Sequence, residues 1–218
     1  MEVRALLAEI ALLAFPILAA IVFHEVSHGA VAYLCGDPTA ARHGRLTLNP
    51  LPHIDPVGTV LLPALLLLAP LALGTRPFVF GWAKPVPIDP QRFRHPRRDT
   101  VLVALAGPGT NLLLAAISAV VLKLLPAGAD AMSLAGAAAF MCRAAIQFNC
   151  VLAVFNLVPI PPLDGGRVLM ALLPLQAARA MVALEGIGYV IVLLVVLNTG
   201  VLGTLVRPLM MFFLGLAR

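Results

Sequence analysis

Residues 14–29 read AFPILAAIVFHEVSHG, an apolar run that leads directly into two histidines spaced four residues apart. On a helix, residues at this spacing lie on one face, so His24 and His28 can bind the same metal ion. Glu25 is then placed to act on a metal-bound water. The opposing interpretation is a pair of core histidines with a snorkelling glutamate. It is weak, because an acid at membrane depth costs at least ~2.5–3.5 kcal/mol and is functional by default.

The composition excludes a soluble enzyme, a disordered tail and a disulfide scaffold. Of the 218 residues, 61% are apolar and 11% are charged, and glycine raises the apolar share to about 69%, against ~45–50% in soluble domains. A soluble core of this size would leave much apolar surface in water. The net charge of +5 is spread over loops between apolar stretches. This pattern predicts orientation in a bilayer and no nucleic-acid partner.

The apolar segments predict an all-α polytopic membrane protein, with residues 1–218 forming a single integral-membrane domain of about four to six transmembrane helices. The N-terminal run resembles a signal peptide, but it continues into the histidine motif without a convincing cleavage site, so we expect an uncleaved helix over residues 5–35. Further spanning helices are expected at about 100–125, 134–157 and 181–199, each long enough for the ~20 residues that a bilayer requires.

Two segments leave their membrane disposition open. Residues 36–99 are expected to hold a basic loop and a short or re-entrant apolar segment at 57–74, which Pro63 and Pro70 interrupt. Residues 201–218 carry Arg207 near their middle, an expensive place for a charge in hydrocarbon. Residues 81–89 (GWAKPVPID) are expected to form a small extended or β element at a membrane face.

A metal site with two imidazoles needs a third protein ligand, and Asp164 is the best candidate. Two imidazoles and a carboxylate suit zinc, with a fourth position left for water. Asp164 follows three prolines in NLVPIPPLDGGR (156–167), which stop the preceding helix and free backbone polar groups. At membrane depth such backbone is tolerated only beside protein or a water-filled cavity. Gly165 and Gly166 permit close backbone approach or positive φ. The alternative is a plain turn in which Asp164 caps the next helix.

Three motifs together resemble the site-2 protease family of intramembrane zinc metalloproteases, in its compact prokaryotic branch. They are HEVSHG (24–29), AGPGTN (106–111) and FNLVPIPPLDGGRV (155–168). GRLTLNPLPHIDPVG (44–58) and GWAKPVPID (81–89) are also similar to that branch. Larger members carry a PDZ or CBS regulatory domain, and we expect neither in this chain.

The resemblance implies roles for individual residues. One Zn²⁺ ion is bound by His24, His28 and Asp164, and Glu25 is the catalytic base. Asn156 assists in stabilising the oxyanion. The implied activity is that of a zinc-dependent endopeptidase, which hydrolyses peptide bonds in or near transmembrane segments of membrane-protein substrates (regulated intramembrane proteolysis).

The two ligand motifs must lie on the same side of the membrane if they share one ion. The histidines lie near the end of their helix and Asp164 follows helix 134–157, so an even number of crossings must separate them. Helices 100–125 and 134–157 supply two, so residues 57–74 should fold back. Ten Lys and Arg residues then lie on the side of the site and three on the opposite side. The positive-inside rule accordingly places the site toward the cytoplasm of a multi-pass cell-membrane protein.

A helical substrate must unwind before its amide bonds can be attacked. Residues 81–89 would hold an unwound substrate by β-augmentation, or they form a surface loop that Trp82 anchors at the membrane interface. The first alternative makes substrate contacts of Trp82, Lys84, Pro85 and Val86. Asn149 lies seven residues before Asn156, on about the same helix face. It is a candidate for substrate contact or for an interhelical hydrogen bond.

Two other functions would use similar residues. A membrane metal transporter should have a series of metal-binding side chains along a path across the bilayer, whereas here the candidate ligands concentrate at two motifs. A non-catalytic homologue that acts as a binding module would lack Glu25 or a ligand, and none of these residues is missing. The expected partners are a transmembrane protein or peptide substrate and the lipid bilayer.

Overall fold

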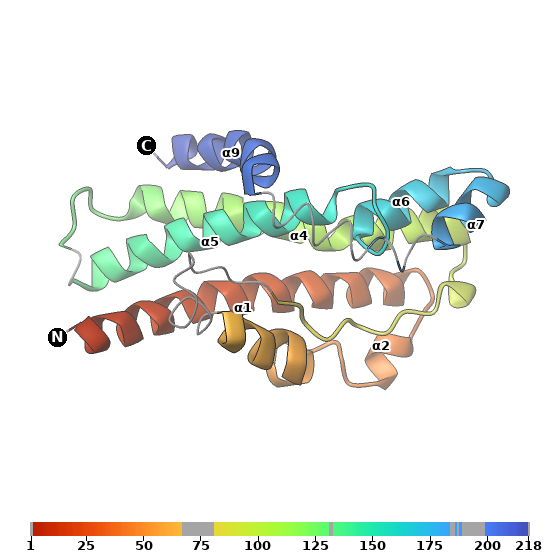
Figure 1. The fold of residues 1–218 in the computed structure, drawn as a ribbon, viewed down its shortest axis with the longest axis horizontal. Coiled ribbons are helices and arrows are strands. Elements are labelled where there is room, and N and C mark those ends of the chain that lie inside the picture. The colour runs from red at the N-terminus through yellow and green to blue at the C-terminus, as the bar shows by residue number, and fades with distance from the viewer. Residues whose placement is uncertain are drawn as a thin grey trace.

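The computed structural model describes residues 2–66, 81–130, 133–183, 186, 188 and 199–217. Three long helices dominate this part of the chain: α1 (Glu2–Leu34), α4 (Pro96–Leu124) and α5 (Leu134–Asn156). Each contacts the other two, and in Figure 1 they lie along the long axis of the molecule, with α4 running opposite to α1 and α5. The described residues are helical or irregular and contain no β-strand. The all-α prediction is confirmed.

All three long helices are long and apolar enough to cross a membrane. The candidate spans are Ala11–Leu34, Pro96–Leu124 and Leu134–Asn156, of 24, 29 and 23 residues. At ~1.5 Å of rise per residue, about 20 residues cross the ~30 Å hydrocarbon core. The chain is therefore a membrane protein, with spans close to those predicted at 5–35, 100–125 and 134–157. The fourth predicted span, 181–199, lies mostly outside the described residues.

Short elements connect α1 to α4. They are α2 (Thr39–Arg42), the 3₁₀ turns η1 (Leu51–His53) and η3 (Pro90–Arg92), and the π-helical η2 (Pro56–Leu61). The Asp55 side chain caps η2 by accepting hydrogen bonds from Val57 N and Gly58 N. The described helical backbone of this apolar stretch, residues 56–66, reaches about 17 Å. Residues 67–74 of the predicted re-entrant segment lie outside the described part.

Three helices follow α5 in the described chain: α6 (Asp164–Leu172), α7 (Leu175–Ala183) and α9 (Thr199–Leu216). Helix α6 packs on α4, and α9 packs on α5 and α4. In Figure 1, α6 and α7 lie at the end of the molecule where α1 ends. The segment with undecided disposition, 201–218, is thus largely one helix, on which Arg207 is exposed.

Small side chains allow α4, α5 and α9 to pack closely. Ala115 and Ala119 of α4 are fully buried against Ile146 and Cys150 of α5, and α9 contributes Phe213. Small residues at such contacts let helix backbones approach each other. The free thiol of Cys150 belongs to this packed cluster.

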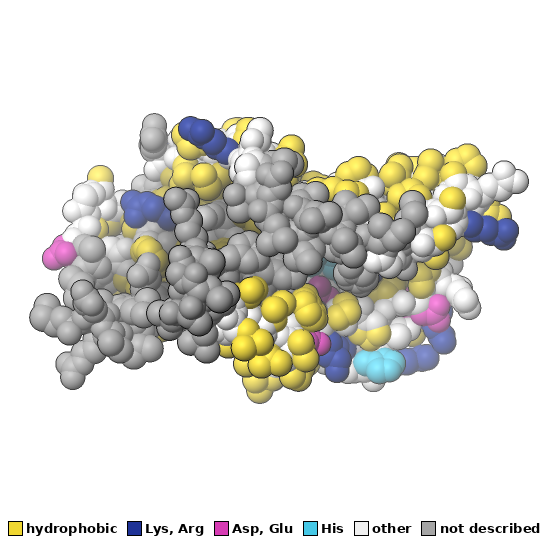
Figure 2. All heavy atoms as spheres, in the orientation of Figure 1, with side chains coloured by type: hydrophobic (Ala, Val, Ile, Leu, Met, Phe, Trp, Pro, Cys, Tyr) yellow, Lys and Arg dark blue, Asp and Glu magenta, His cyan; other side chains and the backbone are white. Residues whose placement is uncertain are grey.

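The outer surface of the helices is apolar, as a lipid-facing surface must be. Leu113, Val120 and Leu124 of α4 are among the exposed large hydrophobic side chains. In Figure 2, hydrophobic side chains gather over η2 and over α6 and α7, and most of the charged side chains visible on this face lie near its margins.

Candidate metal centre

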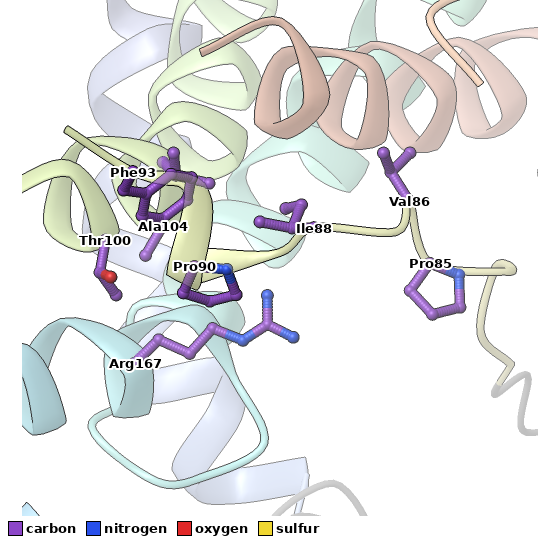
Figure 3. Close-up of a pocket in the computed structure, with 9 residues that line it drawn as sticks. Pro85, Val86, Ile88, Pro90, Phe93, Thr100, Ala104 and Arg167 are labelled. Carbon is purple, nitrogen blue, oxygen red and sulfur yellow. The ribbon is translucent and has the colours of Figure 1, made fainter. Parts of the chain in front are cut away.

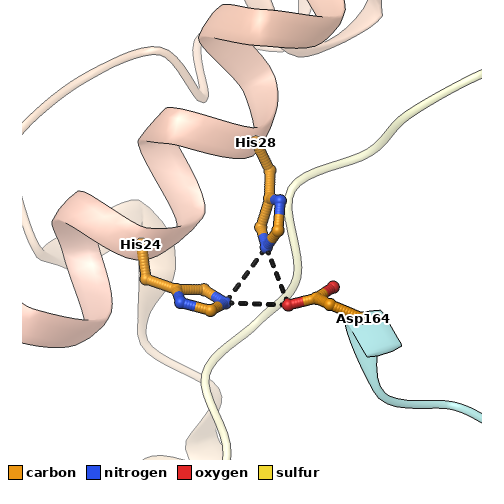
Figure 4. Close-up of side chains that lie close together, drawn as sticks. All are labelled: His24, His28 and Asp164. Carbon is orange, nitrogen blue, oxygen red and sulfur yellow. Dashed lines mark hydrogen bonds and ion pairs between the residues drawn. The ribbon is translucent and has the colours of Figure 1, made fainter. Parts of the chain in front are cut away.

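Three buried side chains meet between α1 and the start of α6 (Figure 4). The Nε2 atoms of His24 and His28 lie 3.0 Å apart. Asp164 Oδ2 lies 3.3 Å from His24 Nε2 and 3.2 Å from His28 Nε2. All three residues are buried, and in the described part of the chain they form the one group of this kind able to hold a metal ion. The sequence prediction thus named three residues that the fold brings together.

The ring nitrogens that face away from this cluster are also engaged. His28 Nδ1 lies 2.7 Å from the Val103 carbonyl oxygen of α4, and His24 Nδ1 lies 2.6 Å from Asn111 Oδ1. A carbonyl oxygen can only accept, so His28 carries its proton on Nδ1 and donates it to Val103. In the neutral ring, its Nε2 atom then presents a lone pair to the cluster.

The donor set fits a bound cation. Asp164 Oδ2 is buried without a hydrogen-bond partner, and it faces the lone pair of His28 Nε2 at 3.2 Å. Two buried electron-pair donors at this distance repel each other unless a positive charge lies between them. Ligands held ~2.0–2.2 Å from a tetrahedral zinc lie roughly 3.3 Å apart, which matches the observed spacing. The cluster is therefore arranged as three protein ligands of one ion.

Gly107 lets α4 approach the two imidazoles. A Cβ atom on this residue would lie 2.4 Å from His28 Nε2 and 2.5 Å from His24 Cε1. Real side chains do not make contacts this short, so a larger residue would displace the ligands. A Cβ atom on Gly109, two residues on, would meet nothing within 4 Å. Of the two glycines in AGPGTN, only Gly107 is required by the packing of the metal site.

The turn between α5 and α6 places Asp164 in the first turn of α6. The N-cap residue is Leu163, with no side-chain capping bond, so Asp164 does not act as the plain cap considered above. A Cβ atom on Gly165 would lie 2.3 Å from the Leu157 carbonyl oxygen, and one on Gly166 would lie 2.5 Å from Pro161 N. Neither glycine has a positive φ. Of the two predicted reasons for this glycine pair, close backbone approach is therefore the one that holds.

Glu25 contacts the extended segment that precedes η3. Its Oε2 atom accepts a hydrogen bond from Val86 N at 2.8 Å, and the residue is partly exposed. The Asp164 carboxylate has a charged neighbour, since Arg167 Nη1 lies 3.7 Å from Asp164 Oδ1. The glutamate is thus fixed by one backbone amide from a chain segment 61 residues away.

Residues 82–86 of this segment are held along one edge. Trp82 N donates to the Gly58 carbonyl, Lys84 N donates to the His53 carbonyl, and Val86 N donates to Glu25. In extended backbone, alternate residues direct both polar groups to the same edge. Residues 83, 85 and 87 therefore direct theirs to the opposite edge, where Pro85 and Pro87 supply carbonyls but no N–H. That outer edge consists almost entirely of acceptors. No strand forms in this segment, so the predicted extended element is present without β pairing.

Asp37 anchors the far end of the segment. It is fully buried, its Oδ1 accepts from the amide and hydroxyl of Thr39, and its Oδ2 accepts from Asp89 N at 2.7 Å. Burial raises the pKa of Asp37, but the hydrogen bonds from Thr39 and from the Asp89 amide outweigh it, so the pKa lies below its ordinary value.

A pocket of about 300 Å³ opens between the extended segment, the N-terminal part of α4 and the N-terminal part of α6 (Figure 3). In this view the Arg167 side chain reaches from α6 toward Pro90 and Ile88. The pocket adjoins the metal centre, because it shares Val103 with the His28 contact, Val86 with the Glu25 contact and Arg167 with the Asp164 contact. The lining is mainly apolar: Pro85, Val86, Ile88, Pro90, Phe93, Thr100, Val103, Ala104 and Arg167.

Comparison with known proteins gives a consistent result. The model of the family described as "Peptidase family M50" matches residues 126–197. "Putative zinc metalloprotease YwhC" of Bacillus subtilis (strain 168) is 42% identical over 173 residues, which cover 78% of this chain and 73% of that protein. The chain belongs to peptidase family M50, the site-2 protease family. "Putative zinc metalloprotease Rip2" of Mycolicibacterium smegmatis is 31% identical over 175 residues, 80% of this chain and 62% of that protein. No solved structure matches.

Membership of the M50 family identifies the ion as Zn²⁺, for which His24, His28 and Asp164 supply suitable ligands. Asn156, the last residue of α5, donates from Nδ2 to the Leu152 carbonyl at 3.0 Å. Asn149 is buried and accepts at Oδ1 from Asn111 Nδ2 at 2.8 Å. This is the interhelical hydrogen bond that the sequence left open as an alternative. Its role in substrate contact stays a prediction.

The other predicted substrate residues lie along the extended segment. Trp82 packs its indole ring over Gly58, the Lys84 carbonyl accepts from Arg45 at 2.6 Å, and Pro85 and Val86 line the pocket. The contact of His24 with Asn111 was not predicted, since AGPGTN was recognised only as a motif that resembles the family. An available signal was the amide of Asn111 at membrane depth, where a polar side chain requires a partner.

Proposed function

We propose that this M50 protein is a zinc-dependent intramembrane endopeptidase, which hydrolyses peptide bonds in or near transmembrane segments of membrane-protein substrates. The observation that carries the proposal is the convergence of three buried ligands beside a partly exposed glutamate, at the end of membrane-spanning helices. Two of these residues come from α1, a helix long enough to span the bilayer, and the third begins the short helix α6, which packs on α4. We also propose that residues 1–218 act as a single integral-membrane domain.

Glu25 performs the proton transfers in this proposal. Zinc held by the three ligands supplies Lewis acidity, which lowers the pKa of water toward ~7 and polarises a scissile carbonyl. The Val86 amide occupies Oε2 of Glu25, so Oε1 is the atom that takes the proton from the attacking water. The same carboxyl group then delivers this proton to the leaving amine. The reaction consumes one water molecule and breaks one peptide bond, which gives a carboxylate and an amine.

Asn156 is proposed to donate to the oxyanion. One N–H of its amide is engaged with the Leu152 carbonyl, and a primary amide has two N–H donors. The second N–H is available to a substrate oxygen. Loss of one such donor typically raises a barrier by ~2.7–4 kcal/mol.

The acceptor-rich edge and the pocket support a site for an unwound substrate. A substrate strand along the outer edge would donate its own amides to the carbonyls of Pro85 and Pro87. A side chain next to the scissile bond would then enter the apolar pocket beside Val103 and Ala104. Such a site favours a substrate with an apolar residue at this position, as in a membrane-spanning sequence.

We propose that the site faces the cytoplasm of the cell membrane. The connection between α1 and α4 joins the ends of these helices nearest the ligands, and together with the first turn of α4 it carries eight of the 15 Lys and Arg residues of the chain. Basic residues are retained on the cytoplasmic side of bacterial and eukaryotic membranes.

The decisive experiment compares the purified protein with Glu25→Gln on a membrane-embedded peptide substrate in detergent with zinc. Glutamine keeps an oxygen for the Val86 amide but cannot take a proton, so cleavage should fall by at least ~10²-fold with zinc still bound. Equal cleavage by both proteins would refute the assigned base. Metal flux through reconstituted vesicles without cleavage would favour a transporter, and substrate binding without either would favour a non-catalytic homologue.

A further inference from the structure

Two asparagines at membrane depth connect the metal centre with α5. Asn111 of α4 is fully buried, and Asn149 of α5 is 2% exposed. Both belong to helices long enough to span the bilayer. An amide in such surroundings is stable only when its donors and acceptors find partners. The hydrogen bonds of this pair therefore define which way each amide points.

The hydrogen bond of Asn149 to a backbone carbonyl fixes the orientation of both side-chain amides. Asn149 Nδ2 lies 2.8 Å from the Ala145 carbonyl oxygen, which can only accept, so the amide nitrogen must point there. Asn149 Oδ1 then faces Asn111 Nδ2 at 2.8 Å. Asn111 Nδ2 also lies 3.1 Å from the Ala20 carbonyl oxygen. Both N–H groups of Asn111 are thus directed at acceptors.

The remaining atom of Asn111 determines the state of His24. Asn111 Oδ1 lies 2.6 Å from His24 Nδ1, and an amide oxygen accepts but does not donate. The proton of the His24 ring must therefore be on Nδ1, which leaves the lone pair on Nε2. Nε2 is the atom that faces His28 and Asp164.

We propose that Asn149 and Asn111 form an amide relay, in which two backbone carbonyls (Ala20 and Ala145) fix the amide of Asn111 and the amide of Asn111 fixes the tautomer of His24. Both asparagines are positioning residues for the zinc ligand, since neither faces the ligand cluster itself. The relay rests on the metal centre of the proposed function, but it does not depend on proteolysis. Hydrogen bonds of this kind set the tautomer and orientation of metal-binding histidines.

The relay can be tested at His24 because the two histidines are oriented by different kinds of group. His28 is oriented by the backbone carbonyl of Val103, which no side-chain substitution removes. His24 depends on side chains alone. Asn111→Leu removes the acceptor at nearly constant volume, and Asn149→Leu removes the outer acceptor while leaving Asn111 in place. Gln147→Leu is the matched control, because it replaces an exposed amide on the same helix as Asn149.

The experiment measures zinc affinity by competition with a chelating dye, together with the ¹⁵N spectrum of histidine-labelled, metal-free protein in detergent. Asn111→Leu should weaken zinc binding about 10- to 100-fold and remove the single Nδ1–H tautomer of His24. Asn149→Leu should weaken binding less, with partial loss of that tautomer, and Gln147→Leu should match the parent protein. If Asn111→Leu does not fold, Asn149→Leu decides the question.

Parent-like zinc affinity and an unchanged His24 tautomer in a folded Asn111→Leu or Asn149→Leu variant would overturn the relay. Neither readout involves a substrate. Failure of the relay is therefore distinguishable from failure of the proposed proteolytic function, which Glu25→Gln tests separately.

Discussion

The two halves of the site are held in different ways. The ligand half, the proposed metal ligands His24, His28 and Asp164, is buried, and each imidazole has a partner on the nitrogen that faces away from the cluster. The base half, the proposed general base Glu25, is partly exposed and accepts a hydrogen bond from one amide of an extended segment. An ion requires ligands fixed before it binds, whereas a proton carrier must meet water and substrate. The difference predicts that metal binding and proton transfer can be damaged independently.

The largest effect should come from the carboxylate ligand. Asp164→Asn removes the negative charge that offsets the ion, so zinc binding should fall by more than the ~100-fold typical of a lost supporting hydrogen bond. Cleavage should disappear with it. Metal content of the purified variant checks this result, with Asp130→Asn, a change at an exposed residue between α4 and α5, as the control. An Asp164→Asn protein that retained stoichiometric zinc would contradict the ligand assignment.

A second change tests the packing of the ligand half. Gly107→Ala would push a methyl group into both imidazoles, and overpacking of this kind costs about 1–3 kcal/mol. We expect weaker zinc binding and a lower Tm. Gly109→Ala, in the same motif, meets open space and should change neither property. Similar zinc affinities for the two variants would show that close packing of α4 on the histidines is unimportant.

A third change acts on the base half alone. Val86→Pro removes the amide that holds Glu25, so kcat should fall roughly tenfold, a part of the 10²–10⁴ that a general base contributes. Zinc affinity should stay at the parent value. Val86→Ala shortens the side chain but keeps the amide, and it should retain most of the activity. Loss of zinc from Val86→Pro would mean that the two halves are not independent.

The smallest effect concerns the anchor of the extended segment. The pKa of Asp37 is lowered in the folded protein, so its ionised form stabilises the fold above the unfolded pKa of ~3.9. This contribution is lost as the pH falls below ~4 and through the lowered pKa. Asp37→Asn should cost about 1–2 kcal/mol at pH 7, with a difference in Tm from the parent that shrinks toward pH 3. A pH-independent difference in Tm would contradict this role.

The sequence predicted that His24, His28 and Asp164 lie together because the signals of the two motifs are local. Two histidines four apart on an apolar helix, and an aspartate after a proline-rich helix end, each specify their own geometry. Contacts across the fold were not predictable in the same way. His24 meets Asn111 87 residues away, and Glu25 meets Val86 61 residues away. No periodicity links such partners, because their meeting depends on how α1, α4 and the extended segment pack together.

The two prolines at the outer edge of residues 82–87 also disfavour edge-to-edge pairing of this segment with a second copy of itself. An exposed extended segment is ordinarily a template for association between identical chains. Here, two copies placed edge to edge would bring carbonyl oxygens of Pro85 and Pro87 against carbonyl oxygens of the neighbour, and the copies would repel. An unwound foreign chain with free N–H groups meets no such repulsion. The same pair of residues is thus compatible with the substrate strand proposed above, and it disfavours occupation of this edge by the same segment of another copy.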